Sequence, residues 1–216
     1  MHVTLKHPLP GVRAQLEMAP EYRKPSLIRP APQGARDAAV LVLLTPVNEG
    51  RCKDDILDWE VLLIRRNSYP GVHSGQIAFP GGKREKNDGD LWQTACREAF
   101  EEVGVKKRDF NKIGSLSSIY VPPSNFLIHP FVAVNNNAIS FTPDPHEVVD
   151  IKNVPVGTFD PCKSEMIEFD YRDGTKRYAP AWTYEDFIVW GATAMILSEL
   201  YRLIDEKAVA ASLTAI

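Results

Sequence analysis

Three glutamates stand close together in residues 97–105, which read Arg-Glu-Ala-Phe-Glu-Glu-Val-Gly-Val. On a helix, Glu98, Glu101 and Glu102 occupy positions i, i+3 and i+4, so their carboxylates share one face. Like charges at this spacing repel one another, and the trio itself contains no Lys or Arg that relieves them. A hard divalent cation such as Mg²⁺ would offset the repulsion, because it prefers carboxylate oxygens and often bridges them to a phosphate. The pattern therefore predicts a metal site.

A turn with two glycines lies just upstream, in Phe79-Pro80-Gly81-Gly82. Glycines let the backbone turn sharply and come close to a phosphate or a metal. Bound Mg²⁺ or Mn²⁺ would neutralise a diphosphate, align it and lower the pKa of a bound water. Arg97 can hold one carboxylate in place through a bidentate contact. The alternative is that Glu101 and Glu102 are merely a solvated helix face, which is the usual explanation for a bare Glu-Glu pair.

Short apolar segments predict the strands that must position these residues. Ala38–Pro46 is a continuous apolar run, which is typical of a strand buried on both faces. The turn residues Arg172-Asp173-Gly174-Thr175 predict a hairpin between strands at 165–171 and 176–184. Further strands are expected at 59–66, 76–79, 112–120 and 127–134 and from residue 148 to 151, with polar or Pro- and Gly-containing loops at 49–55, 67–74 and 83–89.

The glutamates are expected on a helix that starts after Asp90, which is a good N-cap, with Gln93 completing a capping-box pattern. Gly104 ends this helix, and its apolar stripe consists of Trp92, Ala95, Cys96, Ala99 and Val103. A second helix is expected at 190–204, where the chain is apolar around most of the circumference. Together the elements predict an α/β protein, with a mixed β-sheet sandwiched between α-helices.

The length of 216 residues suits one domain, and 44% apolar and 25% charged residues are ordinary for a globular protein. We expect residues 1–36, which contain six prolines, to form an irregular N-terminal arm with one helical turn or two. Residues 37–206 are expected to form the domain, and residues 207–216 a C-terminal tail.

Charge and cysteine content narrow the partners and the compartment. The net charge of −3 argues against broad nucleic-acid binding, which needs a basic surface. No apolar run reaches the ~18 residues of a membrane helix, and the N-terminus has no secretory pattern. Cys52, Cys96 and Cys162 form no CxxC pair and are expected to be free thiols. We therefore expect a cytoplasmic protein that binds neither membranes nor nucleic acids.

From Gly82 the order is five residues, Asp88, eight residues, and then Arg97-Glu98-Ala-Phe-Glu101-Glu102-Val-Gly104. This order strongly resembles the Nudix box of the Nudix hydrolases, which reads Gly, five residues, Glu, seven residues, Arg-Glu-x-x-Glu-Glu-x-Gly. Asp88 replaces the usual Glu, which in the family pairs with the box arginine, and one extra residue separates it from Arg97. The resemblance implies a Nudix fold for residues 37–206, with Arg97 and the three glutamates as catalytic residues and the Gly82 carbonyl as a further metal ligand.

Residues 62–82, LLIRRNSYPGVHSGQIAFPGG, resemble the signature of the coenzyme A diphosphatase branch of that family. The signature reads Leu-Leu-Thr-x-Arg-Ser, three residues, Arg, three residues, Gly, three residues, Phe-Pro-Gly-Gly. The residues that match are Leu62, Leu63, Arg66, Gly75, Phe79, Pro80, Gly81 and Gly82. The resemblance implies that a coenzyme A-like substrate is bound by Arg66, Gly75, Phe79, Pro80 and Gly81. For Arg66 alone, a surface charge at a strand end is the alternative.

Three positions depart from this signature, namely Ile64, Asn67 and Gly71, which stand for Thr, Ser and Arg. The arginine missing at Gly71 matters, because coenzyme A carries a 3′-phosphate that needs a cation. The candidates to replace it are Arg65, Lys83 and Arg84.

Two later segments extend the resemblance. Val189-Trp190-Gly191-Ala192-Thr193-Ala194 resembles the Trp-Gly-x-Thr-Ala stretch of the same branch, and we expect Trp190 to pack in the core at a helix start. Many Nudix enzymes take an extra metal ligand or general base from a late loop. Glu147 is the candidate here, the alternative being a simple Glu at a strand start. His73 either contacts phosphate or is an exposed loop residue.

The resemblance implies a metal-dependent hydrolase that uses Mg²⁺ or Mn²⁺ to cleave the diphosphate linkage of coenzyme A or acyl-CoA. The products would be adenosine 3′,5′-bisphosphate and 4′-phosphopantetheine or its acyl form. Glu98 is expected to help deprotonate the attacking water, and Glu101 and Glu102 to be the main metal ligands. Alternatives are hydrolysis of ADP-ribose, a sugar nucleotide or a dinucleotide, and a non-catalytic domain that senses a nucleotide. The N-terminal arm could cover the site, mediate contacts of a homodimer, or do neither.

Overall fold

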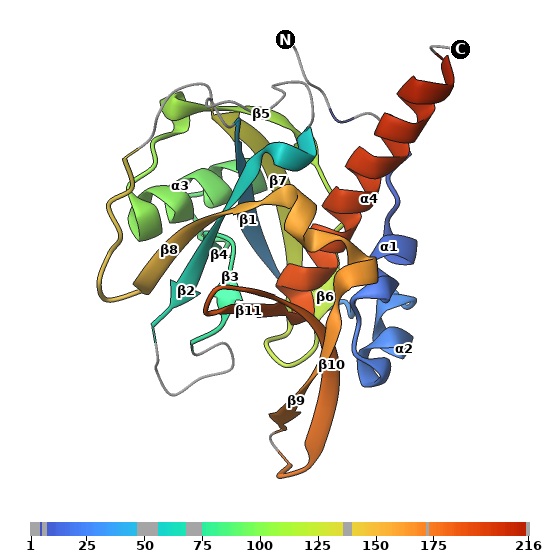
Figure 1. Ribbon diagram of the computed structural model, residues 1–216. Helices are drawn as coiled ribbons and strands as arrows, with labels where there is room; N and C mark the ends of the chain where they lie inside the picture. The colour runs from blue at the N-terminus through green and yellow to red at the C-terminus, as the bar shows by residue number, and fades with distance from the viewer. Residues whose placement is uncertain are drawn as a thin grey trace.

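A mixed β-sheet lies at the centre of the molecule, with helix α3 (Leu91–Val103) on one face and helix α4 (Gly191–Thr214) on the other (Figure 1). The computed structural model describes residues 5, 8–46, 56–67, 75–135, 140–171 and 173–214, and the side chains of these up to residue 205. The predicted α/β arrangement of a mixed sheet between helices is therefore confirmed.

Strand β1 (Arg36–Thr45) is the centre of the sheet. It pairs in parallel with β7 (Phe126–Asn135) and antiparallel with β2 (Glu60–Arg66). The order of the sheet is β3-β2-β1-β7-β5, where β3 is Ile77–Ala78 and β5 is Phe110–Ser115. Three further strands join this path: β4 (Gly81–Lys83) pairs with β1, β6 (Ile119–Val121) with β7, and β8 (Val148–Pro155) with β2.

The apolar run in β1 is buried on both faces, as its sequence predicts. Leu41 and Leu43 belong to the core cluster that contains Ala95 and Ala99 of α3. Val42 and Leu44, which point to the opposite face, belong to the cluster that contains Met195 of α4 and many of its neighbours. Each face of the strand thus holds one helix in place, and α3 is the helix that carries the three glutamates.

A second, antiparallel sheet consists of β9 (Glu165–Asp170), β10 (Lys176–Tyr184) and β11 (Phe187–Trp190). The predicted hairpin is confirmed, with Lys176 opposite Asp170 and Gly174 at φ 77° in the turn. Strand β11 was not expected, and Trp190 ends it rather than starting the helix. Gly191 separates the two elements because its φ of 66° is a left-handed conformation that favours glycine.

Two expected boundaries were wrong. Helix α4 does not end at Ile204 but continues to Thr214, through the Ala-rich segment expected to be a tail, and alanine is the best helix former. The strand expected at 112–120 is interrupted between β5 and β6. The interruption has a visible cause, because the Ser117 backbone N–H donates to Oε1 of the buried Glu199 in α4, at 3.1 Å, instead of to a neighbouring strand.

The N-terminal arm packs beside α4 (Figure 1). Its described part contains α1 (Val12–Glu17), a 3-10 turn (Glu21–Arg23) and α2 (Lys24–Leu27), so it is more regular than expected. Gln15 Nε2 donates to Glu199 Oε2 at 2.9 Å, and Ser198 Oγ donates to the Ala14 carbonyl at 2.7 Å. These buried hydrogen bonds dock the arm onto the second helix layer.

The remaining described elements are short. They are the 3-10 turns at Ile56–Asp58, Lys107–Asp109, Val156–Phe159 and Pro161–Lys163. Cys96 and Cys162 carry free thiols, as expected, whereas Cys52 lies outside the described residues. None of the helices described here is both long enough and apolar enough to cross a membrane.

Candidate active site

Helix α3 begins and ends where its capping residues predict. Asp90 Oδ1 accepts a hydrogen bond from the Gln93 backbone N–H at 2.7 Å. The Gln93 side chain accepts from Gly89 at 3.3 Å and not from Asp90, so the capping box is shifted by one residue. At the other end Gly104 has φ 74°, and its N–H donates to the Phe100 carbonyl at 3.0 Å.

Glu98, Glu101 and Glu102 share one side of α3, but they differ sharply in exposure. The side chain of Glu102 is 0% exposed, that of Glu98 is 12% exposed and that of Glu101 is 50% exposed. The trio therefore runs from the protein interior to the solvent. Burial of this kind disfavours a charged carboxylate, and it raises the pKa of Glu98 above its ordinary value.

Arg97 relieves the repulsion within the trio, which corrects the expectation that no Lys or Arg at the right spacing does so. Its Nη1 lies 2.9 Å from Glu98 Oε1 and 2.8 Å from Glu101 Oε2. Arg97 and Glu101 are four residues apart, which is the helical spacing at which opposite charges attract. One guanidinium thus holds two of the three carboxylates.

Asp88 pairs with Arg97 although it is shorter than the glutamate of the family pattern and one extra residue separates it from Arg97. Arg97 Nε is 3.0 Å from Asp88 Oδ1, and Nη2 is 3.0 Å from Oδ2. Asp88 Oδ2 also accepts from Thr94 Oγ1 at 2.9 Å and from the Glu85 backbone N–H at 2.8 Å. The Arg97 guanidinium holds the pKa of Asp88 well below its usual range, and the pair raises the pKa of Arg97 in turn.

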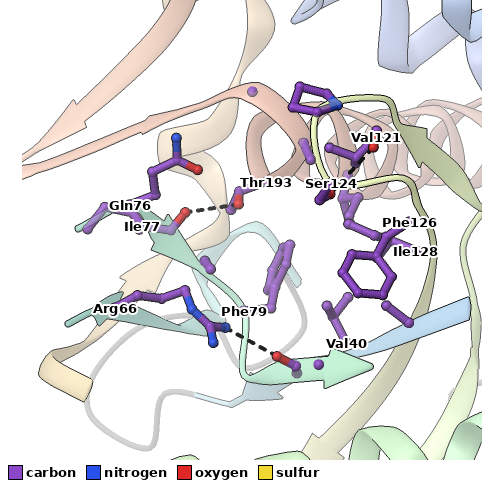
Figure 2. Close-up of a pocket in the computed structure, with 18 of the residues that line it drawn as sticks. Val40, Arg66, Gln76, Ile77, Phe79, Val121, Ser124, Phe126, Ile128 and Thr193 are labelled. Carbon is purple, nitrogen blue, oxygen red and sulfur yellow. Dashed lines mark hydrogen bonds between the residues drawn. The ribbon is translucent and has the colours of Figure 1, made fainter. Parts of the chain in front are cut away.

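Glu102 is the most unusual group of the site. Its Oε2 accepts from the Gly81 backbone N–H at 2.8 Å. Arg66 Nη1 lies 3.1 Å from Oε1 but donates its hydrogen bond to the Gly81 carbonyl at 3.2 Å (Figure 2), so Oε1 accepts no hydrogen bond within the described residues. Burial raises the pKa of Glu102 to about 7, although Arg66 and the Gly81 N–H oppose the shift.

The two glycines of the turn are required by close approaches on both sides. A Cβ on Gly82 would lie 2.4 Å from Glu98 Oε2, and a Cβ on Gly81 would lie 2.4 Å from the Ala39 carbonyl oxygen of β1. A larger residue would collide with backbone at Gly81 and would displace the Glu98 carboxylate at Gly82, so the glycines let the turn fit between the first glutamate and the central strand.

The donor chemistry of this site fits a divalent metal ion. Glu102 offers a buried carboxylate oxygen without a hydrogen bond, next to the carboxylate of Glu98 and the Gly82 backbone. The charge of Glu147 contributes to the raised pKa values of Glu98 and Glu102, which places it in the same electrostatic environment. In the described part of the chain, however, no three acidic, His or Cys side chains converge on one point. Glu98 and Glu101 are instead turned toward Arg97.

The site opens into a cavity of about 930 Å³. The expected site residues that line it are Arg66, Phe79, Gly81, Gly82, Arg97, Glu98, Glu101 and Glu147. Glu102 lies buried behind this wall, and neither Gly75 nor Pro80 lines the cavity. In Figure 2, Arg66 and Phe126 lie on opposite sides of the pocket, with Phe79 between them.

Several residues that line the cavity carried no recognisable signal in the sequence. They come from the N-terminal arm, the β7 strand and the second sheet, and they include Tyr22, Arg23, Phe126, Ile128 and Phe169. Trp190 was expected in the core, and that expectation was wrong. Its ring is partly exposed, lies 4.5 Å from that of Phe169 between centroids, and lines the cavity, because β11 turns it toward the hairpin.

Lys83 is the one candidate replacement for the missing signature arginine that lines this cavity. Arg65 pairs with Asp186 and lies over the ring of Phe187, 4.9 Å from its centroid. Arg84 Nη2 donates to the carbonyls of Asp88 and Gly89, at 3.5 Å each. Gly71 and His73 themselves lie outside the described residues.

Comparison with known proteins agrees with the resemblance of residues 82–104 to the Nudix box. The profile of the NUDIX domain matches residues 35–177. A protein of Pectobacterium atrosepticum named "Uncharacterized Nudix hydrolase NudL" is 30% identical over 204 residues, which cover 90% of this chain and 93% of that protein. "Nudix hydrolase 15, mitochondrial" of Arabidopsis thaliana is 30% identical over 198 residues, covering 85% of this chain but only 62% of the plant protein.

Solved structures give a partial match. The crystal structure of the Nudix hydrolase RenU from M. smegmatis has a TM-score of 0.49 at 15% identity, over 82% of this chain and 87% of that one. The family profile covers well over half of the chain, and it includes the turn, Asp88, Arg97 and all three glutamates. On this sequence evidence, the chain belongs to the Nudix hydrolase family.

Proposed function

We propose that the protein is a metal-dependent hydrolase that cleaves the diphosphate linkage of coenzyme A or acyl-CoA. The products are adenosine 3′,5′-bisphosphate and 4′-phosphopantetheine or its acyl form. The observation that carries the proposal is the buried Glu102 oxygen without a hydrogen bond, which lies behind the Gly81–Gly82 turn at the wall of a nucleotide-sized cavity. The substrate assignment is supported by the signature residues Arg66 and Phe79, which line the same cavity.

The groups that would hold Mg²⁺ or Mn²⁺ are the carboxylates of Glu98, Glu101 and Glu102, with the Gly82 carbonyl and Glu147 as further ligands. When bound, the ion supplies charge neutralisation for the diphosphate and a water of lowered pKa.

The protein's own residues then have separate tasks. Arg97, itself fixed by Asp88, holds Glu98 and Glu101 at the wall of the cavity through its Nη1. Arg66 supplies positive charge beside Glu102 and the Gly81 carbonyl, where a phosphate of the substrate would also need it. Glu98, which lines the cavity, takes the proton of the attacking water. The apolar side chains of Val40, Phe79 and Phe126 exclude bulk water from the bound substrate.

Turnover of coenzyme A tests the proposal directly. Purified protein is incubated with coenzyme A and Mg²⁺ or Mn²⁺, and chromatography detects adenosine 3′,5′-bisphosphate. We expect turnover with at least one metal, and its loss in Glu102→Gln. No release of the bisphosphate under either metal would exclude coenzyme A as the substrate.

One observation favours a second candidate, a hydrolase of ADP-ribose, a sugar nucleotide or a dinucleotide. Gly71 stands where the signature has an arginine, and such substrates carry no 3′-phosphate. A higher kcat/KM for ADP-ribose than for coenzyme A would select this alternative.

We further propose that the protein is cytoplasmic and forms a homodimer, and that its hydrolase domain spans residues 37–206. These three statements are predictions from the sequence.

A further inference from the structure

Arg23 is a buried arginine on the wall of the active-site cavity, in a part of the chain that no motif marks. It is 7% exposed and lies in the 3-10 turn of the N-terminal arm. Its Nη2 donates to the Tyr120 carbonyl at 2.9 Å, which fixes the guanidinium at this place. Its Nε has no hydrogen-bond partner among the described residues.

The positive charge of Arg23 has no carboxylate partner among the residues that the structure describes. No carboxylate oxygen of the described residues lies within 4.0 Å of its guanidinium. The groups that face it are the phenols of Tyr22, Tyr120 and Tyr171, and burial lowers the pKa of Arg23. A buried cation is costly unless an anion pairs with it, and a ligand can supply that anion.

Arg23 lies across the cavity from the carboxylate end. Tyr120, to which it is bonded, is the neighbour of Val121, and in Figure 2 Val121 and Arg66 lie on opposite sides of the pocket. Arg66 contacts Glu102 and so marks the carboxylate end. The apolar residues Phe79, Phe126 and Ile128 line the same cavity, together with polar ones such as Ser124 and Thr193. One cavity thus has an arginine at each side.

The arm holds Arg23 firmly enough to serve as a binding group. Besides the bonds of Gln15 and Ala14 to α4, Arg202 Nη2 pairs with Glu17 Oε2 at 2.8 Å. Leu27 and Met18 of the arm belong to the core cluster under α4. A residue placed by so many contacts loses little conformational entropy when a ligand binds.

We propose that Arg23 binds a phosphate monoester of the substrate that is remote from the scissile diphosphate. This inference rests on the proposed coenzyme A-type substrate, whose 3′-phosphate is such a group. Arg23 then binds the 3′-phosphate from the N-terminal arm. The signature arginine, which is replaced by Gly71 in this chain, would bind it from the loop. A guanidinium suits this task because it binds phosphate through two parallel N–H bonds.

Nucleotide binding without metal tests the inference. Titration calorimetry compares adenosine 3′,5′-bisphosphate with adenosine 5′-monophosphate, which lacks only the 3′-phosphate. We expect the wild type to bind the bisphosphate about 10- to 100-fold more tightly, the range of a charge-assisted hydrogen bond. Arg23→Gln is expected to abolish this preference and leave the affinity for the monophosphate nearly unchanged. Equal affinities in the wild type would overturn the inference.

Two further variants separate binding from folding. Arg23→Lys keeps the charge but not the two parallel N–H bonds, and it is expected to keep part of the preference, even if Arg23→Gln folds poorly. Arg177→Gln is the matched control, because Arg177 lies over the rings of Tyr22 and Tyr171, 4.8 and 3.4 Å from their centroids, but does not line the cavity. It is expected to retain the preference, and an equal loss in Arg177→Gln would show that Arg23 acts only through packing.

Hydrolysis separates this inference from the proposed function. The wild type is expected to favour coenzyme A over 3′-dephospho-coenzyme A in KM, and Arg23→Gln is expected to remove that difference with kcat little changed. If coenzyme A is hydrolysed but Arg23→Gln affects both substrates equally, the inference about Arg23 fails and the proposed function stands. If coenzyme A is not hydrolysed at all, the proposed function fails.

Discussion

Arg97 and Asp88 form a bidentate ion pair, with Nε 3.0 Å from Oδ1 and Nη2 3.0 Å from Oδ2. Asp88 is one methylene shorter than the glutamate of the family pattern, and one extra residue separates it from Arg97. The two changes compensate, because the pair forms and Arg97 still reaches Glu98 and Glu101 with Nη1. The loop before α3 is thereby tied to the face of the helix that carries the chemistry.

Asp88→Asn is expected to lower the free energy of unfolding at neutral pH by about 2 kcal/mol, since it removes charge-assisted hydrogen bonds to Arg97. The folded-state pKa of Asp88 lies below its ordinary value of 3.8. Such a group stabilises the fold fully above its unfolded pKa and loses that contribution as the pH falls through the folded pKa. The deficit of the variant should therefore be constant between about pH 5 and pH 8 and shrink below about pH 4.

Urea unfolding of wild type and variant across this pH range measures the deficit. Asp170→Asn is the control, because Asp170 is 79% exposed and pairs only at the surface with Lys176. A surface pair of this kind contributes about 0–1 kcal/mol. A deficit of Asp88→Asn that grows toward acid would contradict the assigned pKa direction.

The two glycines of the turn should respond differently to alanine. In Gly81→Ala the new Cβ meets the backbone oxygen of Ala39 at 2.4 Å, and a backbone strand at the sheet centre cannot give way. We expect a loss of stability of about 3 kcal/mol or more from this overpacking. In Gly82→Ala the atoms nearest to the new Cβ belong to the Glu98 carboxylate, at 2.4 Å, which is the end of a flexible side chain and can rotate aside. This variant is expected to fold with a smaller loss but with turnover strongly reduced.

Thermal unfolding together with turnover distinguishes the two variants, and each serves as the control for the other. Equal stability losses in both would mean that the Glu98 carboxylate is held as rigidly as the strand. Full activity in Gly82→Ala would contradict the placement of Glu98 against the turn.

Glu102→Gln should separate catalysis from stability. The carboxylate is fully buried, and burial raises its pKa to about 7 although Oε1 lies 3.1 Å from Arg66 Nη1. A neutral amide therefore removes a costly buried charge, at the expense of this contact with Arg66. The remaining oxygen can still accept from the Gly81 N–H. We expect turnover to fall by a factor of about 10³ or more, as for loss of a main electrostatic group, while the metal-free protein is as stable as the wild type or more so.

Glu60→Gln is a suitable control for this variant, because it changes a glutamate on β2 that does not line the cavity. Unfolding without metal and turnover with metal are measured for both. A large loss of stability in metal-free Glu102→Gln would show that the ionised carboxylate is needed for folding.

The site could be predicted where its signal is local in the chain. Asp90 and Gly104 are caps whose effect is confined to neighbouring residues, and the spacing of Glu98, Glu101 and Glu102 follows from helix geometry alone. The alternation of β1 likewise follows from the strand period, which sends Leu41 and Val42 to opposite faces.

The far wall of the cavity could not be predicted, because it depends on contacts between distant segments. Arg23 is hydrogen-bonded to Tyr120, which lies 97 positions away in the sequence. Trp190 at the end of β11 contacts Phe169 of β9 because both strands pair with β10. Ser117 breaks an otherwise strand-like segment because Glu199, 82 positions away, accepts its N–H. The hydrophobic periodicity of a short segment does not predict contacts between residues that are so far apart in the sequence.

Glu199→Ala is expected to release the N-terminal arm. Glu199 is fully buried and accepts from Gln15 Nε2 and from the Ser117 N–H, so its removal leaves the partly buried Ser117 N–H without this acceptor and Gln15 Nε2 with only its longer bond to the Ser117 carbonyl, at 3.3 Å. The cost is about 2–4 kcal/mol in the free energy of unfolding. Because Tyr22 and Arg23 of the arm line the cavity, KM for the substrate should rise with the loss of stability. Trypsin should cleave after Arg13 faster than in the wild type.

Glu17→Gln is the matched control, because it weakens another contact between arm and α4, the partly exposed pair with Arg202. This pair contributes about 1 kcal/mol or less, so cleavage and KM should change little. Limited proteolysis, urea unfolding and steady-state kinetics on the same preparations measure the three effects. Unchanged proteolysis in Glu199→Ala with a raised KM would mean that the buried glutamate shapes the cavity through Ser117 and β6, and not through the arm.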